Sequence, residues 1–415
     1  MNNARRRGIA ALAVSAVLGG AVAAAVAPTA HAATTPPPAP VPAGLYGKGD
    51  PTYDGVWRQS LALLAQDTAG VRPAARAVDW LTAQQCDSGA FPSYRANSTQ
   101  DCGPKTLPDS NATAAAIQAL AALGGRDAAV RDSVNWLKSV QNEDGGWSYT
   151  PGGASDANST SLVIGALAAA GAEPEKTLSA KDRSPYDALL TFARPCDARE
   201  HGRAFVYQPK QPGIVGDSTA AAVTASAGKG LVVTAPAQAR EAKPACDPAT
   251  IEDAARQGAG YLADALAKTG HLLLPPTPGA SDTKPAPDFG NTADAVVALA
   301  AQGLTEQAAK PLAWLERNAS DWAKESGPAA YAQLVLAAHA TGTDPRDFGG
   351  TDLVAALNAT GPAPEKAQQA QQAEKSGKSG EKDDSGSGVW WFVGAFFAAS
   401  AGAGFLLAGR RKPRS

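Results

Sequence analysis

The fold is decided by residues 109–147, which read DSNATAAAIQALAALGG (109–125), RDAAVRDSVNWLKSV (126–140) and QNEDGGW (141–147). The first run places small apolar residues at the i, i+3 and i+4 spacing of a helix, and the second places bulkier residues such as Trp136. A polar start at Asp109 and a Gly-Gly stop mark where the first helix begins and ends. The stretch therefore predicts a hairpin of one small-residue helix and one bulkier helix.

The same pair of helices recurs along residues 45–360, which we interpret as one domain. A single hairpin cannot bury both of its apolar faces, so neighbouring hairpins must stack. Ala-rich helices pack tightly on the inside, and helices with Trp and Leu fill the outside. We therefore predict an all-α (α/α)6 toroid of six helical hairpins, with an open solenoid as the alternative. The small-residue helices begin near Asp54, Asp109, Asp156, Gly216, Gly290 and Gly327, and the bulkier helices span 72–85, 127–141, 184–195, 248–268, 305–323 and 347–359.

The two ends of the chain predict export and membrane anchoring. Residues 1–32 combine three arginines, an apolar run and Ala30-His31-Ala32, which is the pattern of a secretory signal peptide. Residues 389–409 (VWWFVGAFFAASAGAGFLLAG) carry no charge and are long enough to cross a bilayer as one transmembrane helix. Residues 410–415 form a basic tail, which is typical of the cytoplasmic side. We expect an exported protein, anchored in the cell membrane, whose main domain is extracytoplasmic.

Two further segments separate these ends from the domain. Residues 33–44 form a Pro-rich lead, and residues 361–388 form a polar, low-complexity stalk that we expect to be disordered. Seven of the 37 Lys and Arg residues lie in the signal and the tail, so the exported part has 30 basic and 39 acidic residues and a net charge of −9. A nucleic acid needs a basic surface, so we expect no nucleic-acid partner.

The four cysteines are expected to form disulfides, because their number is even and the chain is exported. Three pairings are possible. Order along the chain favours Cys86 with Cys102 and Cys196 with Cys246. The spacings contain no C-x-x-C pair, which argues against a zinc site, so we predict no metal.

A short motif follows the first two bulkier helices. Residues 141–147 read QNEDGGW and residues 84–91 read QQCDSGAF, in which Ser88 interrupts the Asp-Gly step. Both resemble the Q-x-x-D-G-x-W/F motif of the prenyltransferase and squalene-cyclase repeat family, and the two ends suggest a membrane-anchored bacterial surface member. We interpret the motif as structural, since Asp-Gly favours a tight turn. Its residues are Gln84, Phe91, Gln141, Asp144, Gly145 and Trp147.

The resemblance implies two kinds of enzyme, and the sequence supports neither. The cyclases protonate their substrates with a D-x-D-D motif, which the domain does not contain. The protein prenyltransferases bind zinc through Asp, Cys and His, but His201, His271 and His339 have no Cys or Asp at a ligand spacing. We therefore expect no cofactor, and the sequence leaves enzymatic activity uncertain while favouring its absence.

The same toroid architecture occurs in cobalamin carriers, where a second domain closes over the ligand. The sequence therefore favours a non-enzymatic surface toroid that captures a corrinoid or another amphipathic small molecule for uptake. A membrane transporter or a lid-forming protein would then be its partner. The alternatives are a terpenoid- or carbohydrate-modifying enzyme that uses carboxylates of the inner rim, and a surface interaction scaffold with a filled centre.

The candidate site follows from the arrangement of the inner helices. In a toroid their N-termini gather at one mouth, where their dipoles concentrate positive partial charge. The polar residues at these starts are expected to cap the helices and to form a hydrogen-bonding rim around an apolar cavity. Asp109 and Asp156 are one candidate carboxylate pair, and Trp57 and Tyr331 are candidates for stacking on a sugar. The candidate ligand-binding residues are Asp54, Asp109, Asn111, Asp156, Asn158, Asp217, Asn291, Asp294 and Tyr331.

Overall fold

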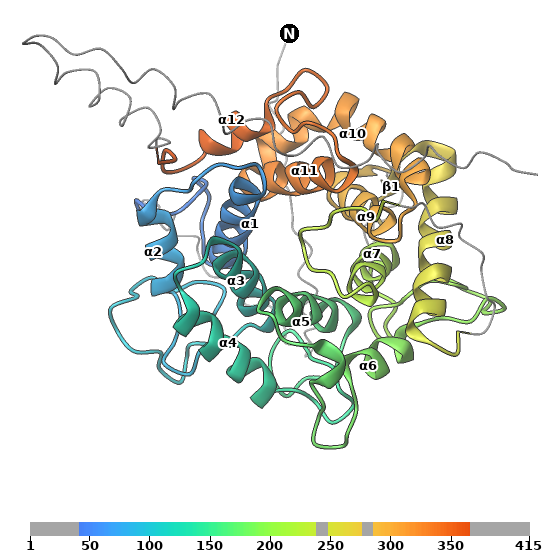
Figure 1. The fold of residues 1–415 in the computed structure, drawn as a ribbon, viewed down its shortest axis with the longest axis horizontal. Coiled ribbons are helices and arrows are strands. Elements are labelled where there is room, and N and C mark those ends of the chain that lie inside the picture. Colours follow the sequence, from blue (N-terminus) through green and yellow to red (C-terminus); the bar gives the residue numbers. More distant parts are fainter. Residues whose placement is uncertain (1–40, 238–247, 276–284, 366–415) are drawn as a thin grey trace, which may run out of the picture. The chain divides into compact units, whose positions relative to one another are not determined.

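The computed structural model describes residues 41–237, 248–275 and 285–365. Within these ranges twelve α-helices form a ring of paired helices (Figure 1). The predicted signal peptide, transmembrane helix and basic tail lie outside the described residues, as do most of the Pro-rich lead and of the polar stalk. No helix in the described ranges is both long and apolar enough to cross a membrane.

Six helices form the inner wall of the ring. Each packs against the next one, and the last packs against the first, so the wall is closed. This closure confirms the predicted toroid and excludes an open solenoid. The inner helices are α1 (Gly55–Thr68), α3 (Ser110–Leu123), α5 (Ala157–Ala169), α7 (Val215–Ser226), α9 (Phe289–Ala301) and α11 (Pro328–Thr341).

The remaining helices form the outer layer, and each packs on the inner helix that precedes it in the chain. They are α2 (Ala75–Ala83), α4 (Asp127–Ser139), α6 (Pro185–Phe192), α8 (Ile251–Thr269), α10 (Thr305–Ser326) and α12 (Leu353–Asn358). A 3-10 helix, η1 (Pro174–Lys176), follows α5, and two short antiparallel strands, β1 (Leu272–Leu273) and β2 (Pro287–Asp288), lie between α8 and α9.

Residue size explains why the chain closes. Ala114, Ala115 and Ala116 in α3 are all fully buried, because each inner helix touches two inner neighbours and one outer partner. Small side chains allow such close approach on every side. Bulkier buried residues such as Trp136 and Leu315 fill the wider outer layer. The size difference between the layers curves the stack into a ring.

A repeated hydrogen bond ties each of three turns to the inner helix that follows it. In each case the backbone N–H of a fully buried aromatic residue donates to the hydroxyl of a threonine in the first turns of the inner helix. Two of these aromatic residues belong to the sequence motif. The pairs are Phe91 with Thr113 (2.9 Å), Trp147 with Thr160 (3.1 Å) and Phe205 with Thr219 (3.1 Å).

The glutamines of the two motif copies align differently from the sequence-based interpretation. Gln141 donates from Nε2 to the carbonyl oxygen of Gly145 at 2.8 Å. In the first copy Gln85, not Gln84, makes the same type of bond, to Gly89 at 3.3 Å. Ser88 therefore takes the place of Asp144 and is not an insertion. Gln84 instead accepts the backbone N–H of Arg95.

The structure contains the favoured disulfide between Cys86 and Cys102, with a Cα–Cα distance of 5.5 Å. It joins the turn after α2 to the loop that leads to α3. Cys196 is also disulfide-bonded. Cys246, its favoured partner, lies outside the described residues.

The ring is sealed where its first and last segments meet, at the fully buried Tyr46. The Tyr46 hydroxyl lies 3.0 Å from Oε1 of Gln66 in α1 and 3.1 Å from the carbonyl oxygen of Pro362. The backbone N–H of Gly47 donates to the carbonyl oxygen of Thr360 at 2.9 Å. The bonds to Pro362 and Thr360 join segments that are more than 300 residues apart.

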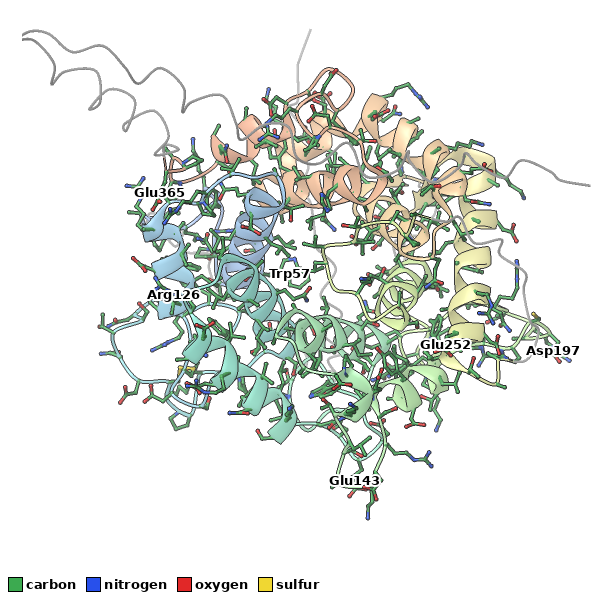
Figure 2. All side chains as sticks on the ribbon, in the orientation of Figure 1. Trp57, Arg126, Glu143, Asp197, Glu252 and Glu365 are labelled. Carbon is green, nitrogen blue, oxygen red and sulfur yellow. A yellow bond between two sulfur atoms is a disulfide. The ribbon has the colours of Figure 1, made fainter. Side chains whose placement is uncertain are left out.

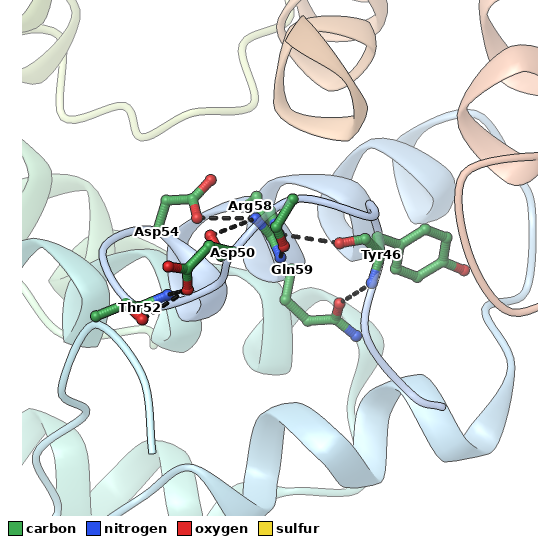
Figure 3. Close-up of polar contacts among 7 residues, drawn as sticks. Tyr46, Asp50, Thr52, Asp54, Arg58 and Gln59 are labelled. Atoms are coloured by element: carbon green, nitrogen blue, oxygen red, sulfur yellow. Dashed lines mark hydrogen bonds and ion pairs between the residues drawn. The ribbon is translucent and has the colours of Figure 1, made fainter. Parts of the chain in front are cut away.

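Arg58 holds the chain before α1 in place (Figure 3). Its side chain is almost fully buried and donates to the carbonyl oxygens of Tyr46 (3.0 Å) and Gly49 (2.9 Å) and to Oδ1 of Asp54 (2.9 Å). Oε1 of Gln59 accepts a further bond from the backbone N–H of Tyr46. A buried guanidinium needs such partners, so the segment from Tyr46 to Asp54 is fixed on α1.

We expect Tyr46→Phe to lower the free energy of unfolding by about 1 kcal/mol, because it removes the hydroxyl that bridges α1 and the end of the ring. Urea unfolding followed by circular dichroism measures the change. Tyr53→Phe is the matched control, since the Tyr53 side chain is 80% exposed. Equal stability of the two variants would show that the bridge does not contribute.

Candidate functional site

The inner helices enclose a cavity of about 290 Å³ at the centre of the ring. All six contribute, mainly from the half of each helix that is nearer its N-terminus. Trp57 of α1 lies on the inner side of the ring and is the one aromatic residue that lines the cavity in the described part of the chain (Figure 2). The polar residues of the inner helices in the lining are Asn111, Gln118, Asn158, Ser161, Asp217, Thr224, Asp294 and Gln333.

The loop after α7 forms part of the cavity wall and reaches into the ring (Figure 1). The backbone N–H of Leu231 donates to Oε1 of Gln118 in α3 at 2.7 Å. Gly230 lies so close to Gly165 of α5 that a Cβ on Gly165 would come within 2.5 Å of its Cα. Both contacts lie near the C-terminal halves of the inner helices. The loop therefore closes the cavity at the end away from the N-terminal mouth.

Two carboxyl groups face this cavity from adjacent helices, Asp217 of α7 and Asp294 of α9. Nδ2 of Asn158 in α5 donates to Oδ2 of Asp217. Nε2 of Gln333 in α11 lies 3.3 Å from Oδ2 of Asp294. Each carboxyl is therefore oriented by an amide of the neighbouring inner helix. Neither has a cationic partner among the described residues.

The environment raises the pKa of both carboxyl groups. Burial raises the pKa of Asp217 to about 6, and the charges of Asp288 and Asp156 add to the rise, while the Asn158 bond opposes it. Burial and then the charge of Asp217 raise the pKa of Asp294 to about 7, with the Gln333 bond acting in the opposite direction. Both side chains keep part of their surface open to the cavity. The pair therefore holds about one proton near neutral pH.

Two amide oxygens in the same wall have no protein partner. Oδ1 of Asn111 and Oδ1 of Asn158 are buried and unbonded within the described residues. Buried acceptors of this kind cost free energy unless a donor reaches them.

The structure gives the other predicted carboxylate pair a different role. Asp109 accepts the backbone N–H of Asn111 at 2.8 Å, and Asp156 accepts that of Ser159 at 2.7 Å, so both are helix N-caps. Neither lines the cavity. The pair that faces the cavity is Asp217 and Asp294. Both were among the rim residues predicted from the sequence, but the sequence did not distinguish them from helix N-caps.

Three other candidates lie outside the cavity lining. Asp54 pairs with Arg58 and makes no capping bond. The backbone N–H of Asn291 donates to Asp288, which is the N-cap of α9. The sequence analysis did not identify Asp288 as a cap. Tyr331 is half-buried at the start of α11.

Sequence reasoning also missed Gln118 and Gln333, which line the cavity. Each is a polar residue within an otherwise apolar inner helix, and that contrast was the available clue. The described residues contain no group of three or more His, Cys, Asp or Glu side chains placed to hold a metal ion.

We expect Asp294→Asn to raise the free energy of unfolding by about 4 kcal/mol at pH 8 and to change it little at pH 4. The carboxyl has a higher pKa in the folded protein, about 7, than its ordinary value of 3.8. The folded state therefore binds the proton more tightly, and the wild type loses stability as the pH rises from about 4 to about 7. Asparagine cannot ionise and avoids this loss.

Urea unfolding at the two pH values measures this effect. Asp321→Asn, at an exposed position of α10, is the control and should change stability at neither pH. A similar effect of Asp294→Asn at pH 4 and pH 8 would show that the carboxyl has an ordinary pKa.

Residues 57–213 match the family model of the prenyltransferase alpha-alpha toroid domain. For that part of the chain, the match confirms the resemblance that the motif indicated. No curated protein matches the sequence.

Several solved structures resemble the chain at low identity. A protein from Actinoplanes is 17% identical, with 72% of this chain and 79% of that chain covered and a TM-score of 0.43. A type II terpene cyclase from Scytonema, in complex with geranylgeranyl dihydroxybenzoate, is 14% identical, with coverages of 67% and 73% and a TM-score of 0.42. A glycosidase is 15% identical, with coverages of 72% and 92% and a TM-score of 0.44. Likenesses of this size say nothing about the activity of the chain.

Proposed function

We propose that the toroid is a carbohydrate-modifying enzyme that uses general acid–base catalysis in its central cavity. The observation that carries the proposal is the pair of cavity carboxyls, Asp217 and Asp294, with pKa values of about 6 and about 7. Carboxyls with pKa values near the working pH are suited to donate and accept protons. Structural carboxylates normally gain cationic or backbone partners, and these two have only one amide donor each.

The two carboxyls suit cleavage of a glycosidic bond. Asp294 has the higher pKa and donates its proton to the glycosidic oxygen as the C–O bond breaks. Asp217 is ionised, so it stabilises positive charge at the anomeric carbon and accepts a proton from the attacking water. One carboxylic acid and one carboxylate that flank the bond are the usual requirement for this reaction.

The cavity lining favours a sugar over a terpenoid. Among the described residues, eight polar side chains of the inner helices and Lys229 line it beside apolar side chains such as Leu61, and Trp57 is the single aromatic residue. Hydroxyl groups of a sugar would pair with polar side chains of this lining such as Ser161, Thr224 and Gln333. The carbocations of terpenoid cyclisation need several aromatic faces, which this lining does not offer.

The same cavity argues against the other sequence-based interpretations. A corrinoid is several times larger than about 290 Å³, so it would not enter the cavity. A scaffold with a filled centre would leave no such space.

We also propose that the enzyme works outside the cell while anchored by residues 389–409, since the disulfide between Cys86 and Cys102 fits an oxidising compartment.

A product screen tests the proposal. The full-length chain, in a mild detergent because of its apolar C-terminal stretch, is incubated with a panel of oligosaccharides and polysaccharides, and released sugars are identified by mass spectrometry. The wild type should release a product from at least one carbohydrate, and the double variant Asp217→Asn/Asp294→Asn should release none. Equal release by both proteins would refute the proposed chemistry.

A further inference from the structure

Two tyrosines are anchored beside the cavity by a repeated arrangement. The carbonyl oxygen of Tyr149 accepts the backbone N–H of Ser110, the first residue of α3, at 2.9 Å. Its hydroxyl lies 3.3 Å from Oγ of Ser93, which in turn donates to Oδ2 of Asp109, the N-cap of the same helix, at 2.9 Å. The ring is therefore held at both ends, although 43% of the side chain is exposed.

Tyr207 repeats this arrangement one hairpin further on. Its carbonyl oxygen accepts the backbone N–H of Ala157, the first residue of α5, at 3.0 Å. Its hydroxyl lies near the N-cap of that helix, Asp156, whose charge adds to burial in raising the pKa of Tyr207. Each tyrosine thus sits at the start of an inner helix whose second residue, Asn111 or Asn158, lines the cavity.

A third aromatic ring lies on another side of the mouth. Trp322 of α10 is half-buried and stacks on Phe289, the first residue of α9, with ring centroids 5.4 Å apart. A Cβ on Gly290 would lie 3.8 Å from the Trp322 ring and 3.6 Å from Oε1 of Gln333. Gln333 in turn binds Asp294 in the cavity. Trp322 is therefore one residue away from the cavity wall.

We propose that Tyr149, Tyr207 and Trp322 form an aromatic rim that binds sugar units projecting from the cavity, so that the substrate is a neutral oligosaccharide or polysaccharide chain. This inference rests on the proposed function. A cavity of about 290 Å³ is at the lower end of small-molecule sites and encloses little more than one sugar ring. The rest of a longer chain must cross the mouth, where the rim residues lie.

The chemistry of the rim favours a sugar chain over a membrane or a protein. Each ring is fixed and stands beside hydrogen-bonding groups such as Asp109, Ser93 and Gln333. A pyranose offers both an apolar C–H face and hydroxyls, so it matches an aromatic ring with polar neighbours. Membranes and protein partners bind to contiguous apolar surface, whereas these rings are separated by polar helix starts.

Charge explains why the chain should be neutral. Asp217 and Asp294 both line the cavity, against one cation, Lys229, in the described lining. Besides burial, the charges of Asp156 and Asp288 raise the pKa of Asp217, and those of Asp217 and Asp288 raise the pKa of Asp294, so these acids lie close together. An anionic polymer would meet repulsion from these carboxyls at the mouth. A neutral chain avoids that cost.

Native affinity electrophoresis of the full-length chain tests the inference. The gels contain a mixed-linkage β-glucan, a xylan, a galactomannan or a dextran. At least one polymer should retard the wild type, and Tyr149→Ala and Trp322→Ala should each weaken that binding at least tenfold. Leu178→Ala, which removes a side chain that is 51% exposed in the loop between α5 and α6, should bind as the wild type does. Thermal unfolding of each variant confirms that it is folded.

The outcomes separate this inference from the proposed function. Unchanged wild-type mobility with every polymer, or normal binding by folded rim variants, would overturn the inference. The Asp217→Asn/Asp294→Asn variant should still be retarded by the polymer, because it leaves the rim intact. A wild type that binds a polymer through the rim but releases no product from any carbohydrate would support the inference and overturn the proposed function.

Discussion

Asp294→Asn is expected to lower kcat/KM by about 1,000-fold at pH 6.5, with little change in KM. General acid catalysis contributes roughly 10²- to 10⁴-fold, and asparagine cannot donate the proton. The neighbouring Gln333 remains available to hold the asparagine side chain, so the shape of the site is preserved. Initial rates on the carbohydrate identified by the product screen measure the effect.

The pH profile should carry the signature of the pair. Activity needs Asp217 ionised and Asp294 protonated, so the rate should peak between about pH 6 and pH 7. The Asp217→Asn variant, where it retains activity, lacks the charge that adds to burial in raising the pKa of Asp294. The alkaline limb should therefore move to lower pH.

Asn111→Ala is the control for these substitutions, because Asn111 lines the same cavity without a carboxyl group. We expect it to raise KM more than it lowers kcat. If Asp294→Asn kept more than a tenth of the wild-type kcat/KM, the proton would have to come from another group.

The second large effect concerns stability. Gly145→Ala should lower the free energy of unfolding by about 3 kcal/mol. Gly145 has φ +91°, which an L-residue rarely adopts, and a Cβ there would lie 2.2 Å from the carbonyl oxygen of Ser184. Backbone cannot move aside as a flexible side chain can, so conformational strain and overpacking add together. Urea unfolding of the two proteins measures the difference.

Gly152→Ala separates the two causes. Gly152 has a similar φ of +87°, but a Cβ there would meet nothing within 4 Å. That variant should lose only about 1 kcal/mol, which is the cost of the backbone conformation alone. A loss at Gly145 no greater than that at Gly152 would mean that the turn does not pack against the chain before α6 as the structure describes.

The sequence was sufficient for the ring because size and spacing act locally. Alternation of small-residue and bulkier helices, as in 109–141, sets both the hairpins and their curvature. The alignment of the first motif copy was harder to predict, because the sequence alone does not show whether Gln84 or Gln85 is the motif glutamine. Only the bond from Gln85 to Gly89 distinguishes them.

The site depends on contacts between residues far apart in the sequence, which a local sequence pattern does not predict. Asp109, Asp156 and Asp217 all stand near the start of a small-residue helix. Asp109 and Asp156 are N-caps, whereas Asp217 is the third residue of α7 and points into the cavity. Burial raises its pKa, and the charges of Asp156 and Asp288, the N-caps of two other inner helices, add to the rise. The loop that closes the cavity likewise depends on its bond to Gln118, 113 residues away.

The most direct measurement is the titration of the two cavity carboxyls by ¹³C NMR of the full-length chain with labelled aspartate, assigned by comparison with Asp217→Asn and Asp294→Asn. We expect two carboxyls that titrate near pH 6 and pH 7, with the pKa of Asp294 shifted downward in Asp217→Asn, because the charge of Asp217 is then gone. Titration of both near pH 4, unaffected by the other substitution, would contradict the account.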